Sequence, residues 1–187
     1  MDWLLAIRLC RLTNFSSFTK STALATAIKT AIQRFGSPAL NQLDFPLVVR
    51  MLASMETIIT QFRALQMFAH RAHNKVKGAT FGEDHEFFGE LYPAYETAYD
   101  SLVERTIGLE KPVNITKINK AAAQMSDVAP DSTDRTNFLK IILAGEKDLC
   151  SMIAKENDKA SLGTQNLLQQ LCDDSEARQY QIKQRLG

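Results

Sequence analysis

The sequence has little of what several large classes of protein require. Its three cysteines, Cys10, Cys150 and Cys172, are widely spaced and form no C-x-x-C pair. This favours reduced thiols in a cytoplasmic protein over a disulfide framework or a zinc ribbon. No apolar run approaches the length of a membrane helix, about 20 residues, so we expect a soluble protein without membrane contact.

Several catalytic signatures and a strong overall charge are missing as well. There is no glycine-rich phosphate loop, no nucleophile elbow, no internal repeat and no strand-like alternation. The net charge is only +1, which is no general signature of nucleic-acid binding. The charge is unevenly distributed, however: residues 1–45 carry five basic and two acidic side chains, whereas the rest carries 17 basic and 19 acidic ones.

Apolar residues instead recur at the three- and four-residue spacing of helices along the chain. Within residues 1–45 the spacing predicts a short amphipathic helix that ends near Gly36 and Pro38. Beyond it we expect four long helices and one short one, over residues 44–78, 81–107, 111–127 (short), 132–157 and 167–186. The chain is therefore predicted to be all-α, with a basic, partly helical extension over residues 1–45 and a four-helix bundle over residues 46–187.

Particular positions on these helices carry further predictions. Asp44 is expected to cap the first long helix, and Pro93 to bend the second. Gly145 predicts a close approach of two helices. The inward positions are expected to be mainly large apolar residues: Leu52, Met55, Ile59, Phe62, Ala69, Phe88, Leu91, Tyr95, Leu102, Ile107, Ile115, Ile118, Ala122, Phe138, Ile142, Leu149, Met152, Leu167, Leu168, Leu171, Ser175, Ile182 and Leu186.

Residues 70–104 hold every histidine of the chain, His70, His73 and His85. The same stretch carries Asp100 and Glu104, four residues apart and so on one face of a helix. Imidazoles and carboxylates together suit iron, zinc or manganese. Taken alone, the residues also fit a solvated charged face and a core histidine that is satisfied by a neighbour.

The order and spacing of these residues resemble a known family. The string HNKVKGATFGEDHEFFGELYPAYETAYDSLVERTIGL is similar to the most recognisable segment of the Dps family of miniferritins. In that family a histidine begins an H-x-x-V-K-G turn, a second follows twelve residues later, and an aspartate and a glutamate four apart follow on the next helix. The corresponding residues are His73, His85, Asp100 and Glu104.

The resemblance implies a ferritin-like bundle with a short crossover helix, and a ferroxidase. Peroxide or dioxygen would oxidise Fe(II) at His73, His85, Asp100 and Glu104, which makes iron the metal that the site handles. Ferric iron would be stored in a hollow shell of twelve subunits built from two-fold dimers, which protects against oxidative damage. The implied partners are iron and further copies of the chain, with non-specific DNA as a further candidate.

Helix geometry places the predicted site between subunits. At a rise of 1.5 Å per residue, His85 and Asp100 are separated by about 22 Å on a straight helix. That is too far to share a metal within one chain. The sequence also lacks the E-x-x-H pair of an intrasubunit di-iron centre.

Some residues depart from the family pattern. A carboxylate expected four residues after the second histidine is Gly89, with Glu86 and Glu90 as nearby substitutes. Asn74 replaces an aromatic residue after the first histidine. Ser161 and Asn166, around Thr164, occupy a region that often carries acidic residues for iron entry, and His70 has no role in the family pattern.

Two alternatives to the ferroxidase cage remain open. One is a DNA-binding shell with weak iron chemistry, suggested by the basic extension and by Gly89. The other is a shell with a purely structural role. Trp3, Leu24, Ile28 and Phe35 are large and apolar, so we expect the extension to pack on protein rather than to act as a solvated DNA tether.

Overall fold

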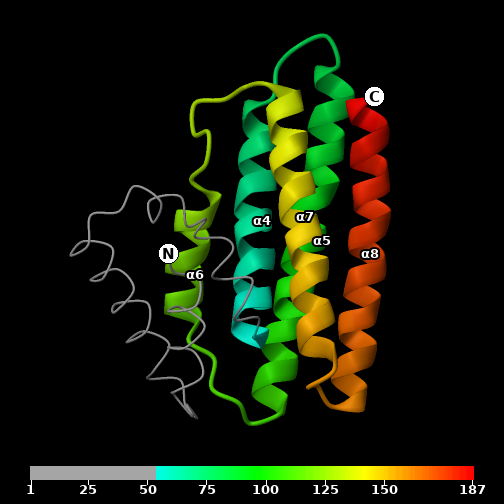
Figure 1. Cartoon of the computed structure of the whole chain (residues 1–187). Helices are drawn as coiled ribbons and strands as arrows, with labels where there is room; N and C mark the ends of the chain where they lie inside the picture. Colours follow the sequence, from blue (N-terminus) through cyan, green and yellow to red (C-terminus); the bar gives the residue numbers. More distant parts are fainter. Residues whose placement is uncertain (1–53) are drawn as a thin grey trace, which may run out of the picture. The chain divides into compact units, whose positions relative to one another are not determined.

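The computed structural model describes residues 54–187, which lie within the compact unit Pro46–Gly187. These residues are all-α, as predicted, with no strand in the range (Figure 1). The helices are α4 (Met55–Lys75), α5 (Phe81–Gly108), α6 (Ile115–Ser126), α7 (Arg135–Asn157) and α8 (Leu162–Leu186). In this described part of the chain, no helix combines the length and the apolar character needed to cross a bilayer. The predicted N-terminal helix, the Asp44 cap and Leu52 lie outside the described residues.

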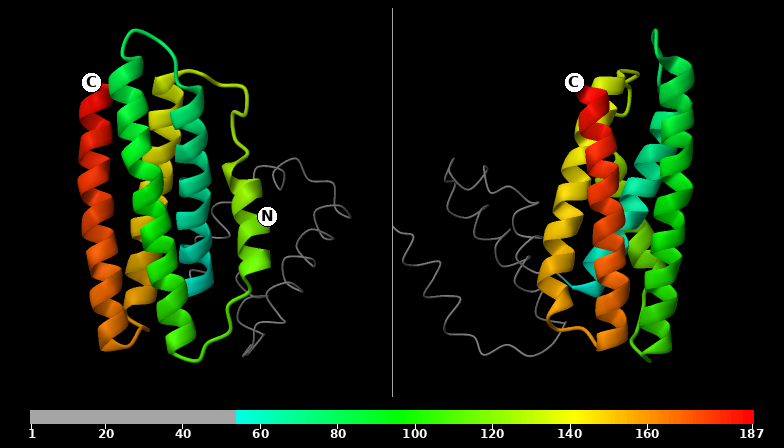
Figure 2. Two further views of the ribbon diagram at one scale, coloured as in Figure 1. Left: turned by 180° about the vertical axis from the view of Figure 1, so that it is seen from behind. Right: turned by 90° about the vertical axis from the view of Figure 1, so that its right-hand side faces the viewer.

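The four long helices form the bundle, with α4 packed on α5 and α7, and α7 on α8 (Figure 2). The short helix α6 lies against the outer side of α4. Because α5 and α7 run in the same direction, the connection between them must return along the whole bundle, and α6 forms part of it (Figure 1). The bundle and its short crossover helix are thus both confirmed.

Side chains near the helix starts satisfy backbone N–H groups that have no partner within the helix. Ser54 and Thr57 form a reciprocal capping box at the start of α4. Asn114 caps α6, and Asp134 accepts hydrogen bonds from the backbone of Thr136 and Asn137 at the start of α7. These caps place the starts of α6 and α7 a few residues later than the apolar pattern indicated.

Most predicted inward positions are buried in one continuous core. Two predictions were wrong: Ile107 is 56% exposed and Ile115 is 38% exposed. Ile107 is the penultimate residue of α5 and Ile115 is the first residue of α6, where helical spacing continues but neighbouring helices no longer cover the side chain. Tyr95 and Tyr99 are core residues, and Tyr92 is half-buried.

Gly145 marks the predicted close approach of α7 to α4. A Cβ atom at this position would lie 2.7 Å from Leu65 Cδ2, which is too close for any larger residue without a shift. The Gln61 side-chain amide also donates a hydrogen bond to the Gly145 carbonyl, at 3.1 Å. Helix α5 continues through Pro93, and the bend there stays a prediction.

Candidate metal site

His73 and His85 meet at one end of the bundle, in the last turn of α4 and the first turns of α5. Their rings are stacked, with centroids 3.7 Å apart and planes inclined by 24°. The connection between the two helices is short and is tied to the bundle by a hydrogen bond from the Lys77 N–H to the Thr133 carbonyl, at 3.2 Å. The structure therefore brings together two of the four predicted ligands.

The hydrogen bonds of the two rings determine which nitrogen of each remains open. His73 Nδ1 lies 2.8 Å from the His85 carbonyl, and His85 Nδ1 lies 2.8 Å from the His73 carbonyl. A carbonyl only accepts, so each Nδ1 carries the proton and donates. In the neutral rings both Nε2 atoms then hold a lone pair, which is the arrangement that a metal-binding histidine needs.

Gly89 lies directly against this histidine pair. A Cβ atom there would lie 3.1 Å from His73 Nδ1, so a side chain could fit only if the ring moved by a few tenths of an ångström. Glycine stands here where the family pattern has a carboxylate, and the His73 ring packs against the glycine backbone. Glu86 and Glu90 are exposed on α5, and their role as substitutes stays a prediction.

Aromatic rings flank the histidine pair on both sides. Phe81 stacks on His85 with centroids 5.1 Å apart, and Tyr92 contacts His73 edge-on at 5.6 Å. Tyr92 also packs on His70, at 4.6 Å. His70 is exposed, and among the described residues its ring contacts Tyr92 but not His85. Tyr92 therefore links His70 to the histidine pair.

Asp84, the residue before His85, anchors the start of α5. Its carboxylate is 1% exposed and accepts a hydrogen bond from the Thr80 hydroxyl at 2.5 Å. Arg135 Nε lies 3.0 Å from it without the alignment of a hydrogen bond, and Arg185 Nη1 lies at 3.5 Å. These ion pairs tie the His85 turn to the start of α7 and the end of α8.

Asp100 and Glu104 are both exposed, on the same face of α5. Within the described residues neither carboxylate has a hydrogen bond or an ion pair, so their oxygens are available to a ligand. They lie about four helical turns from His85, and the structure does not bring them to the histidines within one chain. Among the described residues, the only compact group of three metal-binding side chains lies elsewhere, between α7 and α8.

The bundle interior contains a buried carboxylate that the sequence patterns did not identify. Glu146 is fully buried and accepts hydrogen bonds from Tyr95 at 2.5 Å, Ser175 at 2.5 Å and Arg178 Nε at 2.6 Å. A sequence signal did exist, because Glu146 continues the Ile142 to Leu149 stripe of α7. The Arg178 guanidinium thus pairs with this carboxylate inside the bundle.

Burial shifts the protonation equilibria of this network. Burial, and then the adjacent Glu146 charge, hold the pKa of Tyr95 well above its ordinary value, so its hydroxyl stays a donor. Burial by itself lowers the pKa of Arg178, but the hydrogen bond and charge of Glu146 outweigh it and the net pKa is raised. The network is therefore a neutral tyrosine, a carboxylate and a guanidinium.

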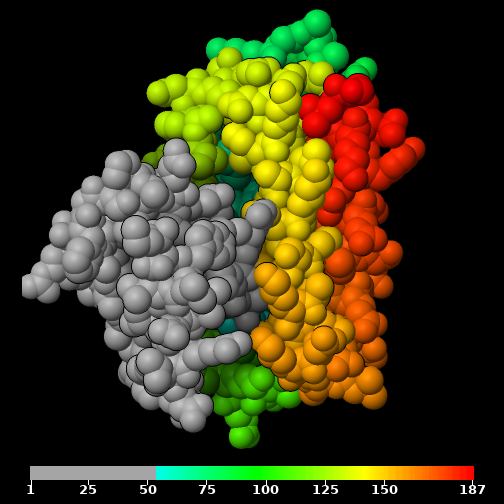
Figure 3. Space-filling model, in the orientation of Figure 1, coloured from blue at the N-terminus to red at the C-terminus, as the bar shows by residue number. Residues whose placement is uncertain are grey.

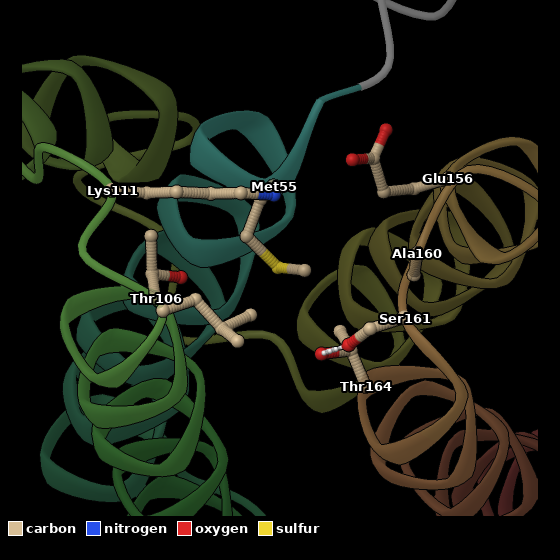
Figure 4. A pocket seen from close by; sticks show the side chains of 8 residues that line it. Met55, Thr106, Lys111, Glu156, Ala160, Ser161 and Thr164 are labelled. Carbon is tan, nitrogen blue, oxygen red and sulfur yellow. Dashed lines mark hydrogen bonds between the residues drawn. The ribbon is translucent and has the colours of Figure 1, made fainter.

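A pocket of about 170 Å³ lies at the opposite end of the bundle (Figure 4). The Ser161 and Thr164 hydroxyls, 2.9 Å apart, line it together with Glu156 and Lys111. Ser161 and Thr164 belong to the segment in which the sequence lacks the expected acidic residues. Glu156, from the end of α7, supplies one carboxylate to this region.

Comparison with known proteins supports the fold. No family model and no curated protein matches the sequence. The structure is similar to the Dps protein of Microbacterium arborescens in its high-iron form, with a TM-score of 0.63, 15% identity, and 77% of this chain and 97% of that chain covered. Dps92 of Deinococcus radiodurans matches with a TM-score of 0.59, 20% identity, and 74% and 86% coverage.

A third similar structure is the DPS protein of Vibrio cholerae O1, described as a member of a superfamily of ferritin-like diiron-carboxylate proteins. It has a TM-score of 0.53, 20% identity, and 71% and 86% coverage. The three structures share one bundle architecture, and the family resemblance read from the sequence points to the same architecture. The described part of this chain has the ferritin-like four-helix fold of the Dps miniferritins.

Proposed function

We propose that this protein is a ferroxidase that oxidises Fe(II) at sites shared between two chains and stores the ferric product inside an oligomeric shell. The observation that carries the proposal is the division of the candidate ligands into two open half-sites, one where α4 meets α5 and one further along α5. His73 and His85 offer two Nε2 lone pairs. Asp100 and Glu104 offer carboxylates without partners among the described residues.

A two-fold axis joins the two half-sites. If the α5 helices of two chains pack antiparallel, the histidines of one chain lie opposite Asp100 and Glu104 of the other. An isologous contact repeats this pairing, so each dimer holds two equal sites. The separation of about 22 Å along α5 then becomes the distance between the two sites of a dimer.

The ligand set suits iron that changes its oxidation state. Carboxylate oxygens stabilise the ferric product, while neutral imidazoles bind the ferrous ion without adding negative charge. Two ferrous ions each lose one electron, and one peroxide molecule takes up these electrons and two protons to form two waters. Iron and peroxide are thus consumed together, which is the chemical basis of the proposed protection against oxidative damage.

The shell belongs to the same proposal. The similarity to Dps structures supports closed assemblies, and twelve subunits built from two-fold dimers is the arrangement that the family resemblance implies. DNA binding depends on residues 1–45, which lie outside the described residues, and stays a prediction.

Shells of mixed composition test the shared site. His73→Ala/His85→Ala and Asp100→Asn/Glu104→Gln should each slow Fe(II) oxidation by at least about 100-fold. Loss of a residue that only hydrogen-bonds to a metal ligand already costs up to about 100-fold, and these variants lose the ligands themselves. In shells assembled at random from equal amounts of both variants, half of the dimers are mixed and each mixed dimer has one intact site. The oxidation rate should therefore recover to about one quarter of the wild-type value.

Controls separate this result from general effects. Asp131→Asn/Asp158→Asn removes two exposed carboxylates outside α5 and should leave the rate unchanged. Recovery requires that mass spectrometry shows both variants in the same shells. Mixed shells that stay as slow as the parents would contradict the shared site, and wild-type rates in the parents would contradict the ligand assignment.

A further inference from the structure

Two cysteines and a glutamate meet between α7 and α8, away from the histidine pair. The Cys150 and Cys172 sulfurs and a Glu176 carboxylate oxygen all lie within 4.8 Å of one another. Cys150 belongs to α7, whereas Cys172 and Glu176 lie one turn apart on α8. The two helices run side by side over their whole length (Figures 1 and 3).

We propose that Cys150, Cys172 and Glu176 form a second metal site, separate from the ferroxidase ligands, that takes Zn²⁺ or another divalent ion of similar softness. Thiolate sulfur and carboxylate oxygen are both zinc ligands, and thiolate sulfur favours zinc over magnesium or calcium. The site lies within one chain and does not require the two-fold partner. It therefore stands whether or not the proposed iron oxidation is correct.

The donors lie near enough to one another to surround a tetrahedral ion. Zinc–sulfur bonds of about 2.3 Å at tetrahedral angles place two sulfurs about 3.8 Å apart. The observed upper limit of 4.8 Å can be closed by small side-chain rotations. Three protein donors leave a fourth position for water or for a ligand, since Glu176 is exposed and the two cysteines are half-buried.

Neighbouring polar groups hold the Cys150 sulfur in position. The Gln179 side chain is only 8% exposed, and its amide donates a hydrogen bond to the Cys150 sulfur at 3.5 Å. The Cys150 thiol donates to Ser175 Oγ at 3.2 Å and lies 3.8 Å from the Cys172 carbonyl oxygen. Such outer contacts orient metal ligands and tune their basicity.

Without a cation the cluster gathers groups that ionise to negative charge. A divalent ion would replace the thiol protons and neutralise this charge, because metal-bound thiols are deprotonated. The bound ion would also link α7 to α8.

Cobalt substitution in the full-length, reduced protein provides the test. Co²⁺ bound to thiolates gives an intense sulfur-to-metal absorption band, whereas histidine and carboxylate ligands do not. We expect one equivalent of Co²⁺ per chain to produce this band, and Zn²⁺ to abolish it by displacement. Cys150→Ser and Cys172→Ser should each weaken binding by at least about tenfold, and Glu176→Gln should weaken it while preserving the band.

The third cysteine supplies a matched control, since Cys10→Ser should bind Co²⁺ as the wild type does. The proposal is overturned if the reduced protein gives no sulfur band, or if the band persists in the Cys150→Ser/Cys172→Ser variant. It is also overturned if Cys10→Ser loses the band. Persistence of the band in Asp100→Asn/Glu104→Gln, which lacks two of the four proposed iron ligands, would confirm that the two sites are independent.

Discussion

Two sets of carboxylates in this bundle have opposite surroundings. Glu146 of α7 is fully buried, and both of its oxygens accept hydrogen bonds from Tyr95, Ser175 and Arg178. Asp100 and Glu104 of α5 are exposed, and the described residues give them no hydrogen-bond or ion-pair partner. A carboxylate whose oxygens are all occupied holds the fold together, whereas one without partners remains free to bind a ligand.

The same contrast supports the proposal of an iron site shared between two chains. Inside the bundle, Arg178 forms an ion pair with Glu146 at 2.6 Å. The open donors lie on α5 and at the end of α4, where a second chain could supply the missing half. Substitutions of the buried Glu146 should therefore lower stability, whereas substitutions of the exposed Asp100 and Glu104 should slow iron oxidation.

The largest effect on stability is expected for Glu146→Ala. The substitution leaves the Arg178 guanidinium, whose side chain is only 13% exposed, without its counter-ion. Breaking such a buried pair costs about 3–5 kcal/mol, and urea unfolding monitored by circular dichroism measures the loss. Glu146→Gln keeps the shape if the alanine variant does not fold. A loss below about 1 kcal/mol, the range of ordinary substitutions, would mean that the network is not a structural tie.

A smaller loss is expected for Asp84→Ala, which removes the anchor of the His85 turn. Asp84 is 1% exposed, but Arg135 and Arg185 are each 30% exposed and can regain water. We therefore expect a cost of about 2 kcal/mol. Glu83→Ala, in the same turn but exposed, should cost less than about 1 kcal/mol. Equal losses in the two variants would remove Asp84 from the anchoring role.

Tyr95→Phe should cost about 1 kcal/mol at neutral pH, since it removes one hydrogen bond to Glu146. The pKa of Tyr95 is raised in the folded state, so the stability from its hydroxyl is complete below the unfolded pKa of about 10 and is lost as the pH rises above it. The difference in unfolding free energy between wild type and Tyr95→Phe should therefore shrink above about pH 10.

Tyr180→Phe is the matched control, because Tyr180 is 64% exposed. Its unfolding free energy should follow that of the wild type at every pH. If the difference in unfolding free energy between wild type and Tyr95→Phe stays constant through alkaline pH, the Tyr95 hydroxyl does not contribute stability through its hydrogen bond to Glu146.

The smallest effect on stability is expected where the effect on iron oxidation is largest. Asp100→Asn/Glu104→Gln removes two exposed charges without described partners, so the unfolding free energy should change by no more than about 0.5 kcal/mol. The measurement is urea unfolding of the same preparations that are used for oxidation kinetics. A loss comparable to that of Glu146→Ala would mean that these carboxylates hold the fold, and the comparison would fail.

Several features of this protein were accessible from residue patterns. The apolar spacing predicted the helices, and Gly145 predicted a close helix contact that the structure shows against Leu65. Where the pattern failed, as at Ile107 and Ile115, the helix continued beyond its neighbours. Helical periodicity reports which face of a helix is apolar, but not where the covering helices stop.

The contacts that distinguish the sites were not accessible in this way. Glu146 and Arg178 are 32 residues apart, and Cys150 and Cys172 are 22 apart, so each pair meets only because α7 and α8 pack together. The spacing of His73 and His85 suggested a site, but not that each ring would donate to the other's carbonyl.

The sequence by itself determined the helical class, the order of the helices and the types of candidate ligand on α4 and α5, because these follow from local periodicity and residue chemistry. Only the tertiary structure decided which polar groups have partners and which do not. Burial and hydrogen bonding depend on packing between segments far apart in the chain. For that reason the occupied carboxylate of Glu146 and the open carboxylates of Asp100 and Glu104 could be told apart only in the folded bundle.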